Sequence, residues 1–207
     1  MNKKVFQEYL KSIIKIPSVS GFESEVSSFI VSKLKKEKIK AIWNIDTKGN
    51  LIIRKGKNFS KLAIVAHMDK FGFYVVGNNK NYLQVVGVRK LSKLSNAQMG
   101  KVYLQGGDNK GIYGTLKNKG KKNNNLRVYL KNTESFPIGT PVIYSSELSL
   151  KGEIVKSAYL DNSLGVCSAI EILKTIDEGT IIFSSQEEAG FLGVSSAIHM
   201  VKPSKVI

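Results

Sequence analysis

The sequence predicts an α/β fold into which a small all-β barrel or sandwich domain is inserted. Amphipathic helical stripes lie near both ends of the chain, and two largely apolar runs, residues 62–66 and 180–184, are typical of strands that helices cover on both faces. Residues 71–156 instead form short β-like runs separated by Gly and Asn, without a helical stripe. We therefore expect residues 1–70 and 157–207 to form a discontinuous outer domain around the inserted block, 71–156.

Two helices are expected before the first strand. Apolar residues recur at four-residue spacing over residues 5–14, which predicts an amphipathic helix that Pro17 ends. Ser20 and Glu23 have the spacing of a capping box, and a second apolar stripe follows over residues 26–34. We expect this box to start the second helix.

Strands and helices then alternate in the outer domain. Residues 41–45 and 51–54 flank a turn-forming segment, 46–50, and predict a β-hairpin. Residues 164–176 and 192–201 have helical patterns on either side of the second apolar run. Such alternation indicates a sheet with helices packed against it.

The composition indicates a globular protein without disulfides. Hydrophobic residues make up 42% and charged residues 23% of the 207 residues, and Cys167 is the only cysteine. Because one cysteine cannot form an intrachain disulfide, a reducing compartment is expected, and we assign the cytoplasm. The longest apolar run, residues 62–66, is far shorter than the ~20 residues of a membrane helix, so we expect no membrane span and no signal peptide.

The positive charge is concentrated in one region. The chain carries a net charge of +16, and residues 80–131 alone hold twelve Lys or Arg against a single acid, Asp108. Four tyrosines lie in this stretch without a recognisable motif, so nucleic-acid binding is the least favoured function; it predicts strongly salt-sensitive binding. The alternative is a Lys- and Asn-rich composition on solvated loops, of which residues 119–125 are typical.

His67 and Asp69 follow the first apolar strand. Because ligands of open α/β sheets gather beyond the carboxyl ends of strands, His67 is well placed to act. Asp69 could hold one ring nitrogen of His67 and leave the other for a metal. The alternative is that the two residues only close a turn.

Two adjacent carboxylates, Glu187 and Glu188, follow the second apolar strand. Adjacent acids raise each other's pKa unless a cation compensates, so the pair favours one metal ligand and one general base. The alternative places both in the first turn of the next helix, where the helix dipole attracts them.

Asp161 precedes a predicted helix and by default would be its N-cap. In the functional interpretation its carboxylate bridges two cations, since carboxylate oxygens suit such sites and imidazole adds selectivity for zinc-like metals. The combination of strand-His-x-Asp, Asp at a helix start and strand-Glu-Glu in one α/β domain favours that interpretation.

Several short motifs together point to one family. The motifs are Ser20-Gly21-Phe22-Glu23, Asp46-Thr47-Lys48-Gly49-Asn50-Leu51, Ala66-His67-Met68-Asp69, Leu160-Asp161-Asn162 and Gln186-Glu187-Glu188-Ala189-Gly190-Phe191-Leu192-Gly193. On these motifs, and on a β-rich block between Asp69 and Asp161, the chain resembles the M42 metallo-aminopeptidases. In M20 relatives the extra domain comes after the Glu pair.

The resemblance implies a di-metal-dependent aminopeptidase that removes N-terminal residues from peptides with metal-activated water. It implies two divalent ions, zinc or cobalt, with His67 and Asp161 on one and Asp161 and Glu188 on the other. Glu187 would be the general base, and Asp69 would orient His67. A zinc-peptidase-like sheet and a homo-oligomer assembled through the β-domain are also implied.

The chain departs from the family in length and in detail. Family chains are longer, and two further ligands, an Asp and a His, would fall beyond Ile207. We therefore expect an incomplete sheet domain that is not competent alone, with a second polypeptide as one source of the rest. Lys70 stands where the family usually has an acid, Asn162 and Ser163 stand where it has Asp-Arg, and His199 is not assigned as a ligand.

One further function stays open. The chain could be a non-catalytic assembly or binding subunit that uses its basic β-domain and has a decayed metal site. Metal content separates this alternative from the peptidase.

Overall fold

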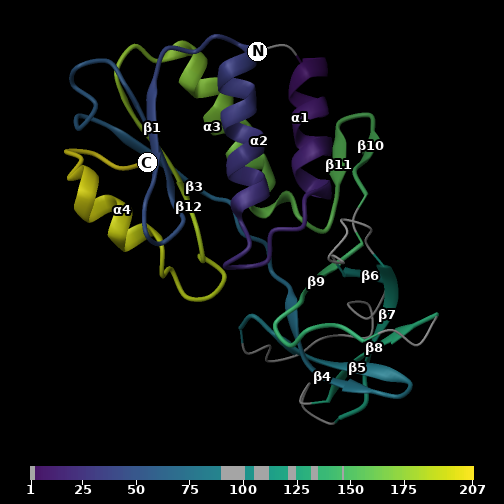
Figure 1. Ribbon diagram of the computed structural model, residues 1–207. Coiled ribbons are helices and arrows are strands. Elements are labelled where there is room, and N and C mark those ends of the chain that lie inside the picture. The colour runs from purple at the N-terminus through teal and green to yellow at the C-terminus, as the bar shows by residue number, and fades with distance from the viewer. Residues whose placement is uncertain (1–2, 90–100, 105–111, 121–124, 132–134, 146) are drawn as a thin grey trace. The chain divides into compact units, whose positions relative to one another are not determined.

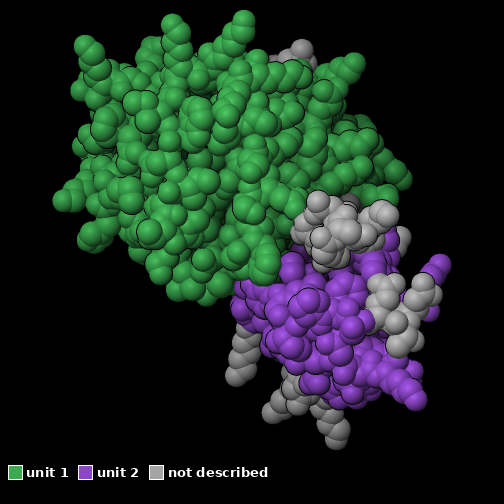
Figure 2. Space-filling view, viewed as in Figure 1, with its two compact units in different colours: residues 1–70, 147–207 green, residues 71–146 purple. Residues whose placement is uncertain are grey.

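The contacts of the chain divide it into two units, residues 1–70 with 147–207 and residues 71–146 (Figure 2). The computed structural model describes residues 3–89, 101–104, 112–120, 125–131, 135–145 and 147–207. The predicted α/β fold with an inserted all-β domain is confirmed, and that domain is a barrel. Asp108 and most of the 119–125 run lie outside the described residues.

The first unit is built on a sheet with the strand order β1-β2-β12-β3 (Figure 1). The predicted hairpin is formed by β1 (Ile42–Ile45) and β2 (Leu51–Lys55), and β12 (Gly179–Ser184) pairs antiparallel with β2 and parallel with β3 (Ala63–His67). On its other side, β3 bonds to residues 205–207, where the Ala63 amide donates to the Lys205 carbonyl at 2.8 Å. The β12–β3 register pairs Ser184 with His67, so the two strands end side by side.

Helices cover both faces of this sheet (Figure 1). Alternate strand residues serve two cores: Ile181 and Phe183 join the cluster with α1 (Lys3–Lys15), α2 (Ser24–Lys36) and α3 (Leu160–Thr175), whereas Ile182 joins the cluster with α4 (Val194–Val201). This explains why β12 is buried along its whole length. None of the described helices has the length and apolarity that crossing a bilayer requires.

The capping box predicted at Ser20 and Glu23 is wrong. Helix α2 begins at Ser24, and Glu23, at the cap position, makes no side-chain cap bond. The Ser20 hydroxyl donates instead to the Asp69 carboxylate at 2.6 Å, and Glu23 accepts from the loop after β12. Both side chains are buried, so contacts with distant strands displace the local cap.

The second unit is a closed barrel in the order β4-β5-β8-β7-β6-β9. Alternate strand residues point inward to one apolar core, and Gly114 permits the close approach of β7 and β8, because a Cβ there would lie 2.6 Å from a Val128 methyl. The strands are β4 (Phe73–Asn79), β5 (Tyr82–Gly87), β6 (Lys101–Leu104), β7 (Ile112–Asn118), β8 (Leu126–Leu130) and β9 (Pro141–Tyr144).

The second boundary between the units lies at residue 147 rather than at the expected residue 157. The ribbon of β10 (Ser149–Lys151) and β11 (Ile154–Lys156) pairs only within itself in the described strands and belongs to the first unit. Leu148, just before it, packs against the core under α1, α2 and α3.

Lys70, the last residue before the barrel, is buried with 1% of its surface exposed. Its ammonium donates to the main-chain oxygens of Ile13 at 2.7 Å, Ile14 at 3.0 Å and Ile16, at the C-terminal end of α1. Burial lowers the pKa of Lys70 to about 7, whereas the carbonyl oxygens at the negative end of a helix favour the charged ammonium. Lys70 therefore ties the end of β3 to the end of α1.

We predict that Lys70→Met will lower the free energy of unfolding by about 3 kcal/mol, because the buried carbonyl groups of α1 lose their donor. Urea unfolding of the purified chain measures this change. The matched control is Lys61→Met at an exposed position, for which we expect a change within about 0.5 kcal/mol. A loss at Lys70 no larger than that of the control would show that the ammonium is not needed.

Candidate metal centre

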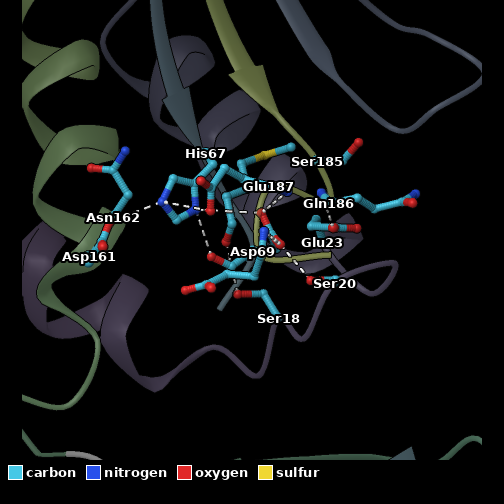
Figure 3. A network of polar contacts seen from close by, with 12 residues as sticks. Ser18, Ser20, Glu23, His67, Asp69, Asp161, Asn162, Ser185, Gln186 and Glu187 are labelled. Carbon is cyan, nitrogen blue, oxygen red and sulfur yellow. Dashed lines mark hydrogen bonds and ion pairs between the residues drawn. The ribbon is translucent and has the colours of Figure 1, made fainter. Parts of the chain in front are cut away.

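Imidazole and carboxylate groups from three elements meet at the carboxyl end of the sheet (Figure 3). His67 ends β3, Asp161 lies at the start of α3 and Glu187 lies in the loop after β12. The Nε2 atom of His67 is 3.0 Å from Oδ1 of Asp161 and 3.8 Å from Oε2 of Glu187. The structure thus brings together residues that lie far apart in the sequence.

Asp161 does not cap α3. Its backbone is non-helical, with φ −83° and ψ 112°, and the Asn162 side chain instead accepts the Gly165 N–H at 3.0 Å. Asn162 therefore caps the regular part of α3, which begins after these two non-helical residues, and the default assignment of Asp161 as the cap is wrong. A Cβ at Gly165 would lie 2.0 Å from Asn162 Oδ1, so this cap requires the glycine. The carboxylate of Asp161, 86% exposed, is left beside His67.

Asp69 is fully buried and contacts both His67 and the loop that carries Glu187 and Glu188. The Nδ1 atom of His67 lies 3.0 Å from the main-chain oxygen of Asp69 and 3.5 Å from its carboxylate. The same carboxylate accepts the N–H groups of Glu187 at 2.9 Å and Glu188 at 3.0 Å, and the hydroxyl of Ser20. Asp69 thus contacts His67 most closely through its carbonyl group, and its carboxylate fixes the backbone of the glutamate pair.

The electrostatics of the site favour a positive charge at His67. Burial lowers the pKa of His67, but Asp69, Asp161 and Glu187 outweigh it and raise that pKa to about 9. Burial likewise acts to raise the pKa of Asp69, but hydrogen bonds from His67, Ser20 and two backbone amides keep it below its usual range. A proton or a metal cation can supply the positive charge that these carboxylates favour.

The described residues fit a metal ion in part. The Nε2 atom of His67 and the carboxylate of Asp161 are suitable metal ligands. The other ring nitrogen, Nδ1, is within hydrogen-bond distance of the main-chain oxygen of Asp69, as is usual in metal-binding histidines. Glu188 is fixed through its backbone amide, with 8% of its surface exposed. However, no group of three or more His, Cys, Asp or Glu residues in the described parts of the chain has the arrangement of a metal site. Zinc sites use three or four protein ligands, so this donor set is incomplete.

Residues around the site were missed as functional candidates by the sequence analysis. Ser20, Glu23 and Asn50 are buried polar side chains, and each of them bonds to the loop after β12 or to Asp69. The available signal was their place in the motifs shared with the M42 family, but those motifs do not say which partner each side chain contacts.

Comparisons with known proteins agree on one family. A family model described as M42 glutamyl aminopeptidase matches residues 49–207. A provisionally named aminopeptidase of Acetivibrio thermocellus is 30% identical over 224 residues, which cover 100% of this chain and 66% of the relative. The lysyl aminopeptidase of Pyrococcus furiosus is 27% identical over 220 residues, covering 95% and 63% of the two chains.

The fold of a solved peptidase is similar as well. The TET1 peptidase of Pyrococcus horikoshii superposes with a TM-score of 0.79 at 21% identity, covering 97% of this chain and 67% of that one. The chain spans less than two thirds of the length of the curated relatives that it matches. Because the family model matches well over half of its residues, this chain belongs to the M42 glutamyl aminopeptidase family.

Proposed function

We propose that this chain supplies part of the metal centre of a di-metal-dependent aminopeptidase that hydrolyses N-terminal residues from peptides. The observation that carries the proposal is the placement of Asp161 and Glu187 at 3.0 and 3.8 Å from Nε2 of His67, at the carboxyl end of an α/β sheet. Membership of the M42 family supports the same reaction.

In this proposal His67 and Asp161 would hold one divalent ion, and Asp161 and Glu188 would hold the second. Zinc or cobalt bound there would lower the pKa of water and polarise the scissile carbonyl group. Glu187 accepts the proton of the attacking water and passes it to the leaving amine. Asp69 keeps Nδ1 of His67 occupied, so that Nε2 faces the site, and holds the backbone of Glu187.

The proposal includes ligands from outside these 207 residues. Three candidate ligands are too few for two cations, because the desolvation of carboxylates is offset only by a filled coordination shell. The remaining ligands would come from further sequence or from a second polypeptide. The competing function is a non-catalytic assembly subunit, which the incomplete donor set of the described residues favours.

Self-association belongs to the same proposal. The Pyrococcus horikoshii TET1 peptidase assembles into a tetrahedron or a large octahedral shell. We propose that this chain also forms homo-oligomers, through the barrel. The barrel exposes large apolar side chains that a partner could cover, namely Val76, Val86, Tyr113 and Ile138.

Metal binding should depend on one of the two histidines. We predict that the chain, assayed alone and again with any polypeptide encoded directly downstream, will bind divalent metal, with about two ions in the complete assembly. His67→Ala should lose most of this metal by elemental analysis, whereas His199→Ala, exposed on α4, should retain it. Absence of metal from the unmodified protein in both preparations would instead support the non-catalytic subunit.

The two carboxylates nearest His67 should differ in effect. We predict that Glu187→Gln will keep its metal but lose about a hundredfold or more in the rate of N-terminal residue release, since the general base is gone. Asp161→Ala should lose both metal and turnover. Metal content and peptide hydrolysis are measured on the same samples of the complete assembly. Undiminished turnover in Glu187→Gln would contradict its role as the base.

The oligomer prediction is tested by light scattering after size-exclusion chromatography. We expect the unmodified chain to elute as an assembly of several copies and Ile138→Asp to shift it toward the monomer, because a buried unpaired carboxylate opposes association. Lys80→Asp, an exposed change of charge on the same barrel, is the control. A monomeric unmodified chain would contradict self-association.

A further inference from the structure

We infer that Glu23 is a positioning residue whose buried carboxylate holds the loop that presents Glu187 and Glu188. The inference rests on the proposed function for what this loop does. The placement of the loop itself rests on contacts that involve no metal.

Glu23 bridges two segments that are far apart in the sequence. It lies just before α2 with 5% of its surface exposed, and its Oε1 atom accepts the N–H groups of Gly21 at 2.8 Å and Gln186 at 3.0 Å (Figure 3). Burial raises the pKa of Glu23, and the hydrogen bonds from these backbone amides oppose that rise. Because Glu23 makes no cap bond to α2, its side chain serves the loop and not the helix.

The loop after β12 no longer pairs with a neighbouring strand. Its successive backbone N–H groups donate hydrogen bonds to side chains instead. The Ser185 N–H donates to Asn50 at 2.9 Å, the Gln186 N–H to Glu23, and the next two N–H groups to the two oxygens of Asp69. Four consecutive amides are thus held by three side chains from other parts of the chain. Buried backbone amides need such partners, and here the partners also set the path of the chain.

Gln186 has a backbone conformation in this loop that needs support from its surroundings. Its φ is +54°, in the left-handed region that residues other than glycine seldom adopt. Such a conformation persists only when surrounding contacts enforce it, and Glu23 bonds to this very residue. Without that bond we expect Gln186 to relax, which would turn the amides of Glu187 and Glu188 away from Asp69.

The test is backbone amide hydrogen exchange, followed by NMR in the metal-free chain. We expect Glu23→Ala to speed exchange at Gln186, Glu187 and Glu188 about tenfold or more, while the amides of β12 stay unchanged. Glu23→Gln keeps a carbonyl oxygen as acceptor and should stay close to the unmodified chain. Glu25→Ala, which removes an exposed carboxylate in the first turn of α2, is the matched control.

Two outcomes would overturn the inference. One is unchanged exchange at Glu187 and Glu188 in Glu23→Ala, and the other is faster exchange in β12 to the same degree as in the loop, which is the mark of a general loss of stability. If Glu23→Ala does not fold, Glu23→Asp carries the test, because its shorter side chain cannot reach Gln186 equally well and the same local change is expected.

A cobalt titration separates this inference from the proposed function. Glu23→Ala should bind Co²⁺ about tenfold more weakly than the unmodified chain, as expected when a residue that supports metal ligands is removed. If the unmodified chain binds Co²⁺, an unchanged Co²⁺ affinity in a folded Glu23→Ala would be a third outcome that overturns the inference. Absence of Co²⁺ binding by the unmodified chain, both alone and with any polypeptide encoded directly downstream, would overturn the metal proposal, and the exchange measurement would still decide the role of Glu23.

Discussion

The buried carboxylate of Asp69 is the constraint on which the rest of the site depends. A carboxylate that has left water must be compensated by hydrogen bonds or charge. Asp69 obtains this compensation from the Ser20 hydroxyl, from the amides of Glu187 and Glu188, and from the ring of His67. These donors come from three segments, so satisfying this one group fixes the segment before α2, the end of β3 and the loop after β12 together.

The sheet explains why these segments can meet at all. Parallel pairing of β3 with β12 puts His67 opposite Ser184, so the chain leaves both strands at the same edge. One residue after Asp69, the side chain of Lys70 bonds to carbonyl groups in the last turn of α1. The ammonium of the lysine next to the histidine-aspartate motif is therefore held at the end of a helix.

The fold could be predicted well from the sequence because the spacing of apolar residues shows which faces of helices and strands are buried. The apolar runs around residues 62–66 and 180–184 mark buried strands, and the His67, Asp161 and Glu187 pattern marks the ends of those elements. Whether a polar side chain bonds to a nearby backbone group or to a distant segment could not be predicted from the sequence. Ser20 and Glu23 have capping-box spacing but bond to Asp69 and Gln186, while Asn162 takes the cap expected of Asp161. A polar side chain fits either partner, and only tertiary packing decides between them.

The two sides of the candidate site are therefore held to different degrees. On the side of His67 and Glu187, buried side chains fix the backbone without help from a cation, so little of the free energy of metal binding would go into ordering the loop. Asp161 stands on the other side with 86% of its side chain exposed, and among the described contacts its carboxylate bonds to His67. A carboxylate so exposed keeps most of its hydration, and part of that hydration is lost when the carboxylate binds a cation. On this side, the free energy of metal binding would therefore include the cost of ordering and desolvating Asp161.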